Sequence, residues 1–139
     1  MSILASFPTL VLHLHSGPSP ALETEWLGFT GSKDFRRYLT AALELARQHR
    51  VRGWIANDQL LGAVRPTDLR WVAEHVLPTL AELGVVRFAR LEAQETLNRM
   101  LIGHMYQNVT PALPLQEQSF ADLTSARTWA TELASPFTA

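Results

Sequence analysis

Two histidines near the N-terminus, His13 and His15, have a spacing that permits metal chemistry. Side chains two residues apart in an extended strand point to the same face, so both imidazoles would project together. They would ligate zinc if a third histidine or carboxylate approached, but the sequence identifies no such residue. We therefore expect two polar residues on the solvent-facing side of a terminal strand, with no metal and no cofactor.

Three carboxylates, Asp58, Asp68 and Glu74, follow a predicted strand, and ligand sites of α/β proteins gather at that end of a sheet. One of them could act as a general base if burial raised its pKa. The chain has no cysteine, no nucleophile elbow, no P-loop and no dinucleotide-binding glycine motif. We expect ordinary turn, helix-start and surface roles and predict no enzyme. A hydrolase or metal enzyme using His13, His15 or His104 is the weakest alternative.

Arg87 and Arg90 interrupt an otherwise apolar strand and, being three residues apart, lie on opposite faces. A buried guanidinium needs a carboxylate or several carbonyls to offset its desolvation. Each is expected to form an ion pair inside or at the rim of the core, in preference to binding an anionic ligand.

An apolar loop offers the best candidate for recognition. Leu60, Leu61 and Val64 occupy a segment expected to be a loop, and Trp71 is offset from the apolar stripe of the helix that follows. Loops are normally polar, and exposed apolar patches usually mark interfaces. Packing of this loop into the core is the equally weighted alternative.

Hydrophobic periodicity predicts nine elements around these residues. Alternating or continuous apolar runs indicate strands, and apolar residues three and four apart indicate helices. The helix that contains Pro78 should kink there, because proline lacks the N–H that would bond the carbonyl of Glu74. The order β-β-α-β-α-β-α-β-α predicts an α/β fold with a mixed, mostly parallel sheet and one domain, 1–139. The expected strands are 9–15, 25–30, 52–57, 85–91 and 115–120, and the helices are 32–49, 66–84, 94–106 and a last one capped by Asp122.

The composition excludes several classes of protein. The chain has 139 residues, of which 47% are hydrophobic and 18% charged, which is too apolar for a disordered protein. Its net charge of −1 lacks the basic excess of a nucleic-acid binder. The apolar stretch 3–14 has no preceding Lys or Arg and is too short to span a bilayer. We expect a cytoplasmic protein without membrane insertion.

Several segments share a common pattern of apolar residues punctuated by Asp, Pro, Gly and Trp: 54–58 (WIAND), 65–71 (RPTDLRW), 77–78 (LP), 84–89 (GVVRFA) and 120–122 (FAD), with Ala126 and Trp129. Together they resemble the SpoIIAA-like, or STAS/Sec14-type, family of small bacterial proteins. In the related anti-sigma-factor antagonists, the loop after the matching strand carries a serine that a partner kinase phosphorylates. Here that loop, 58–64, contains no Ser or Thr, and Thr67 is the first hydroxyl after it. The resemblance implies the fold and a binding role, without the usual phosphorylation switch.

Together these features indicate a non-enzymatic regulatory or protein-binding module of the STAS type. The expected docking surface is the loop with the start of the next helix, and the partner is another protein or a second copy of the chain. Apolar anchors and a polar rim would share the contact. The residues are Asp58, Gln59, Leu60, Leu61, Arg65, Thr67, Asp68 and Trp71.

The Sec14 side of the resemblance implies an alternative, namely a carrier of a lipid or another apolar small molecule. Its ligand would lie in a groove between the sheet and the helices. The expected lining is Phe88, Met100, Leu101 and Met105.

Overall fold

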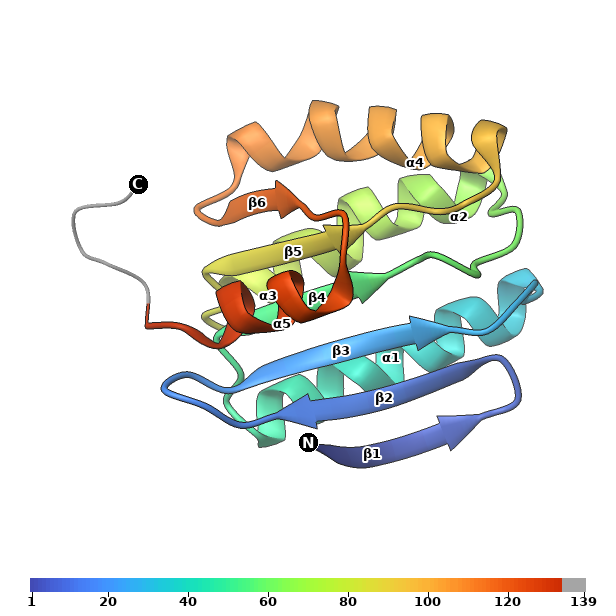
Figure 1. The fold of residues 1–139 in the computed structure, drawn as a ribbon. Coiled ribbons are helices and arrows are strands. Elements are labelled where there is room, and N and C mark those ends of the chain that lie inside the picture. The colour runs from blue at the N-terminus through green and yellow to red at the C-terminus, as the bar shows by residue number, and fades with distance from the viewer. Residues whose placement is uncertain (134–139) are drawn as a thin grey trace.

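The computed structural model describes residues 1–133 and contains a six-stranded sheet with the strands in chain order from β1 to β6 (Figure 1). The pairs β1–β2 and β2–β3 are antiparallel, whereas β3, β4, β5 and β6 run parallel. The fold is therefore the α/β class with a mixed, mostly parallel sheet that the sequence predicts. The strands are β1 (Ser2–Phe7), β2 (Leu10–His15), β3 (Ala21–Trp26), β4 (Gly53–Asn57), β5 (Arg87–Leu91) and β6 (Gln116–Ser119).

Helices cover the two faces of the sheet unequally. Four helical segments pack on one face and form the main core, while α5 (Leu123–Thr131) covers β4 and β5 on the other face (Figure 1). Strand β4 faces both layers: Trp54 belongs to the larger core and Ile55 to the smaller one. This two-sided burial explains why the central strands read as continuous apolar runs. The four segments are α1 (Ser32–Gln48), α2 (Pro66–Trp71), α3 (Leu77–Glu82) and α4 (Thr96–Val109).

The N-terminal part of the sheet differs from the expectation in two places. Strand β1 was not predicted; it pairs with β2 at the edge of the sheet. The partner of β2 is Ala21–Trp26 instead of 25–30, and the two strands pair antiparallel. Within Ala21–Trp26, Leu22 and Trp26 face the larger core and Glu23 faces the opposite side, so the strand does alternate.

The helix expected at 66–84 is interrupted just before Pro78. A π-turn over Val72–Val76 separates α2 from α3, and the N–H of Leu77 donates to the carbonyl of Val72. Such single π-turns are one recognised cause of a break in a helix, and proline is another. The structure therefore places a π-turn immediately before Pro78, where the sequence predicts a kink.

None of the helices within residues 1–133 is long and apolar enough to cross a membrane.

Candidate functional site

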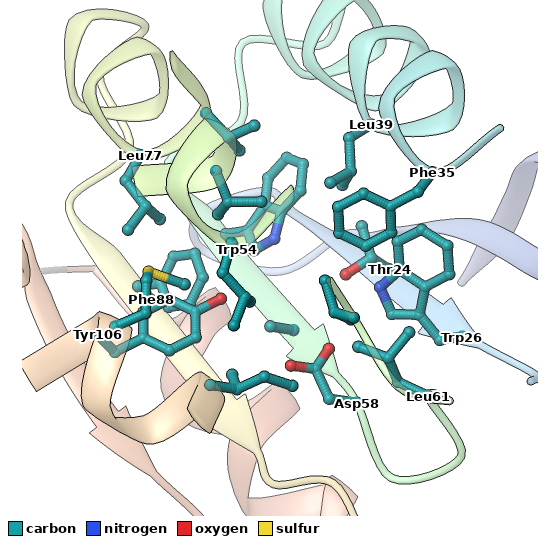
Figure 2. Close-up of a pocket in the computed structure, with 17 residues that line it drawn as sticks. Thr24, Trp26, Phe35, Leu39, Trp54, Asp58, Leu61, Leu77, Phe88 and Tyr106 are labelled. Atoms are coloured by element: carbon teal, nitrogen blue, oxygen red, sulfur yellow. The ribbon is translucent and has the colours of Figure 1, made fainter. Parts of the chain in front are cut away.

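A cavity lies between the sheet and the helices, towards the carboxyl ends of β3 and β4 (Figure 2). Its volume is about 40 Å³. Apolar and aromatic side chains from the sheet, α1, the α2–α3 segment, α4 and the loop after β4 enclose it. The lining is Thr24, Trp26, Phe35, Leu39, Trp54, Ala56, Asp58, Leu61, Val64, Leu69, Val72, Val76, Leu77, Phe88, Ile102, Met105 and Tyr106.

Asp58 is the one carboxylate in this lining. It follows the last residue of β4, where its N–H donates to the carbonyl of Leu91 at 3.0 Å, and its side chain points into the cavity (Figure 2). The residue is only 6% exposed, and its carboxylate receives no hydrogen bond and no ion pair from residues 1–133. Burial raises the pKa of Asp58 to about 7, although the charge of Arg90 opposes that rise. At neutral pH the cavity thus holds a carboxyl group close to its titration midpoint.

The nearest basic group is already engaged elsewhere. Arg90 forms an ion pair with Glu117, with 3.0 Å between Nη1 and Oε1, and its guanidinium lies 4.2 Å from the centre of the Tyr106 ring. Burial and the charge of Asp58 both raise the pKa of Tyr106, so its hydroxyl stays protonated. The carboxylate of Asp58 is therefore the charge in the lining that lacks a partner.

The loop between β4 and α2 forms one wall of the cavity, and Asn98 of α4 holds it in place. The Asn98 side chain donates to the carbonyls of Leu61 at 3.0 Å and Gly62 at 2.9 Å, and accepts from the N–H of Val64 at 3.3 Å. On its other side the loop contacts Phe29, and a Cβ on Gly62 would lie 2.7 Å from the Cα of Phe29. The wall is thus built from three segments that are distant in the sequence.

We expect Asn98→Leu to lower the free energy of unfolding by about 3 kcal/mol, because three backbone groups of the loop lose their partner. Urea denaturation followed by fluorescence measures this. The matched control is Asn108→Leu at an exposed position near the end of α4, which should change stability by less than about 0.5 kcal/mol. Equal stability of the two variants would show that the loop does not depend on Asn98.

The residues expected on a docking surface are divided between interior and surface. Asp58 and Leu61 line the cavity, so Leu61 is not the surface anchor that the sequence suggested. Asp68 is also buried; it accepts from Ser32 at 2.6 Å and from Arg36 at 2.9 Å. Leu60 is exposed, and Trp71 is half-buried beneath the Arg36 guanidinium, 5.4 Å from the ring centre. The remaining three, Gln59, Arg65 and Thr67, are half-buried or exposed.

Residues expected to line a carrier groove are divided in the same way. Phe88 and Met105 line the cavity, as the alternative interpretation requires. Met100 and Leu101 lie outside it, 51% and 38% exposed respectively. The spacing of Leu101 and Met105 places them on the same side of a helix, but the helix packs mainly through Ile102 and Tyr106.

A separate buried polar network lies on the opposite face of the sheet. Glu23 is fully buried and accepts from His15 at 2.7 Å, Arg127 at 2.8 Å and Asn57 at 3.2 Å. Burial raises the pKa of Glu23, but these hydrogen bonds and the charge of Arg127 outweigh it and hold the pKa at about 2. Glu23 is therefore ionised and fully partnered, in contrast to Asp58.

This network corrects the expectation for the two histidines. His13 and His15 share a face as predicted, but both are only 7% exposed, and His13 contacts Glu25 at 2.8 Å. Strand β3 places Glu23 and Glu25 beside β2. The strand expected at 25–30 does not include Glu23, so the sequence did not predict these contacts. In the described part of the chain, no three His, Asp or Glu side chains are grouped to hold a metal ion.

The two arginines of β5 behave as expected, on opposite faces. Arg90 pairs with Glu117 on the side of α4, and Arg87 pairs with Glu132 at 3.1 Å and donates to the carbonyl of Trp129 at 2.8 Å on the side of α5. Glu74 and His104 are exposed and take no part in the cavity.

Sequence reasoning missed most of the aromatic lining. Trp26, Phe35 and Tyr106 come from three elements, and nothing in their spacing shows that they converge. The alternation of Leu22, Thr24 and Trp26 was the one available signal, since it places all three on the face that carries the cavity.

A mixed sheet in sequential strand order, with three helical connections on one face and a last helix on the other, defines the fold class. It is a SpoIIAA-like fold. The chain is similar to the crystal structure of an uncharacterised protein of the DUF3478 family with a SpoIIAA-like fold from Shewanella loihica PV-4. The TM-score is 0.58 and the identity 17%, and the match covers 94% of this chain and 98% of the other. No family model and no curated protein matches the sequence.

Proposed function

We propose that the protein is a binding module that takes up a compact, mainly apolar molecule in the cavity at Asp58. The observation that carries this proposal is the unpartnered carboxylate in an apolar enclosure. A buried charge without a partner lowers stability, and features that cost stability tend to be retained for function. A binding module of this kind needs no catalytic group. The molecule bound at Asp58 would either regulate the protein or be carried by it.

The size of the cavity favours a compact molecule over a long-chain lipid. A cavity of about 40 Å³ has room for roughly three water molecules. A small ligand would require only modest movement of the loop wall, whereas an acyl chain would require the helices to separate.

Native mass spectrometry of untagged protein tests the proposal. The wild type should carry an additional mass that disappears on denaturation. Ala56→Leu, which fills the cavity beside Asp58, should lose it, whereas Ala63→Leu on the exposed side of the same loop should keep it. An additional mass retained by Ala56→Leu would place the bound molecule elsewhere.

Protein docking is the second candidate function, and a different observation favours it. Three large apolar side chains, Phe29, Leu60 and Leu97, are exposed around the loop wall. The backbone ties their segments together, since the N–H of Gln94 donates to the carbonyl of Gln59 at 3.1 Å and Gly62 lies against Phe29. Exposed apolar groups gathered in this way are typical of interfaces.

A second copy of the chain is the partner that can be tested directly. Under this candidate the wild type sediments as a dimer, and Leu60→Asp shifts it to a monomer by placing a charge in the interface. The control is Ile3→Asp, an equally exposed change on the edge strand β1. A monomeric wild type would contradict self-docking, and dissociation by Ile3→Asp alone would move the interface to β1.

A further inference from the structure

The cavity contains one ionisable carboxyl group and no basic side chain that could balance its charge when it is ionised. Among its lining residues Asp58 carries the only acidic side chain, and no Lys, Arg or His lines the cavity. The polar groups besides Asp58 make no bond to it: Thr24 donates its hydroxyl to the carbonyl of Ile55 at 3.4 Å. A bound molecule is therefore the available source of a counter-charge.

The aromatic side chains of the lining also favour a positively charged ligand. The rings of Trp26 and Phe35 stack with 5.1 Å between centres, and those of Phe88 and Tyr106 lie 5.3 Å apart; Trp54 completes the set (Figure 2). Aromatic faces carry partial negative charge and attract cations, most strongly where water is excluded. An anion would meet both these faces and the carboxylate, so the lining disfavours it.

Arg90 does not supply the missing charge. It lies close enough to oppose the rise in the pKa of Asp58, yet its guanidinium is paired with Glu117 and stacked on Tyr106 from outside the cavity. The Arg90–Glu117 pair is neutral as a unit. The ammonium group of a bound ligand would pair with the ionised carboxylate of Asp58. The unpaired buried charge would then become part of a hydrogen-bonded ion pair.

We propose that the ligand of this cavity is an organic amine, with its ammonium group on the carboxylate of Asp58 and a compact hydrocarbon body among the aromatic walls. This inference rests on the proposed binding function and specifies its ligand class. The amine would donate hydrogen bonds to the carboxylate, and no covalent step is involved.

The test compares three probes that share one hydrocarbon body: isobutylamine, isobutanol and isobutyrate. Binding is followed by NMR through the indole N–H signals, because Trp26 and Trp54 line the cavity while Trp129 packs on the other face of the sheet and serves as an internal control. At pH 8 we expect isobutylamine to shift the first two signals and to bind at least tenfold more tightly than isobutanol.

The matched variants are Asp58→Asn and Asp34→Asn. The first should reduce isobutylamine binding to the level of isobutanol and leave isobutanol binding unchanged. Asp34→Asn removes an exposed carboxylate on α1 and should change the binding of neither isobutylamine nor isobutanol. Lowering the pH to 5.5 protonates Asp58, whose pKa is about 7, so the preference for the amine should diminish in the wild type.

The outcomes separate this inference from the proposed function. Equal binding of isobutanol and isobutylamine, or amine binding that survives Asp58→Asn, would overturn the amine class while leaving an apolar binding cavity. Tighter binding of isobutyrate would overturn it in favour of an anion. If no probe moves the Trp26 and Trp54 signals, the inference and the proposed function both fail.

Discussion

Asp58→Asn is expected to stabilise the ligand-free protein by about 3 kcal/mol at pH 8. A shift of the pKa from 3.8 to about 7 corresponds to about 4 kcal/mol of stability lost when the carboxyl ionises, and the buried amide gives back part of the gain. The wild type should therefore be the less stable protein under the conditions in which it would bind its ligand.

The sign of the pH dependence follows from the same shift. The unfolded chain loses the Asp58 proton near pH 3.8 and the folded protein near pH 7, so the folded state holds the additional proton in between. The destabilisation by Asp58 is complete above pH 7 and disappears as the pH falls towards 4. Urea denaturation should show that Asp58→Asn is more stable than the wild type at pH 8 and that it loses this advantage at pH 4.

The control for this prediction is Asp34→Asn, at an exposed carboxylate that pairs with Arg37 on the surface of α1. It should change stability by less than about 0.5 kcal/mol at pH 8. A loss of stability in Asp58→Asn at pH 8 would contradict the prediction, because it would mean that the carboxylate has a partner in the folded protein.

Glu23→Gln is expected to have a large effect of opposite sign, a loss of about 4 kcal/mol at pH 7. Glu23 is fully buried and bound by His15, Asn57 and Arg127, and removing one member of a buried ion pair leaves the other charge without compensation. Because small domains have about 5–15 kcal/mol of stability in total, the loss should be evident in thermal melting as well as in urea.

The pH dependence of Glu23 is also the reverse of that of Asp58. Its pKa is lowered from 4.5 to about 2, so its contribution to stability is complete above pH 4.5 and is lost as the pH falls towards 2. The control is Glu44→Gln on the exposed surface of α1, where no measurable change in stability is expected. Similar stabilities for the Glu23 and Glu44 variants would show that the buried network contributes little.

The regular elements could be predicted because their signals are local. The apolar stripe of α1, with Phe35, Leu39 and Ala42 on one face, depends on residues within that helix. Asp122 caps α5 as expected, accepting from the N–H of Ser125 at 2.8 Å. Such features need no knowledge of distant parts of the chain.

The bounds of β3 could not be predicted in the same way. Glu23 and Thr24 make the segment look too polar for an interior strand, and the group that compensates Glu23, Arg127, is 104 residues away. The two-residue turn that joins β1 to β2 contains Pro8, which concealed the edge strand before it.

The burial of Asp58 could not be predicted from the sequence. The sequence drew attention to Asp58 because it follows a parallel strand. Its burial depends on how the loop folds inwards, which is decided by Asn98 on α4 and by Phe29 before α1. Local patterns therefore left a surface loop and a loop packed into the core equally weighted, and contacts with distant segments make it the wall of a cavity.

A pH titration of the Asp58 carboxyl by ¹³C NMR tests the central claim most directly. The chain has four aspartates, so the signal of Asp58 can be assigned by its absence in Asp58→Asn. We predict a midpoint near pH 7 in the ligand-free protein. Saturating isobutylamine should move that midpoint lower, because an ammonium group favours the ionised carboxylate. A midpoint near pH 4 without any ligand would show that the carboxylate is solvated or already paired. It would contradict the claim that Asp58 is a buried carboxylate without a partner in the ligand-free protein.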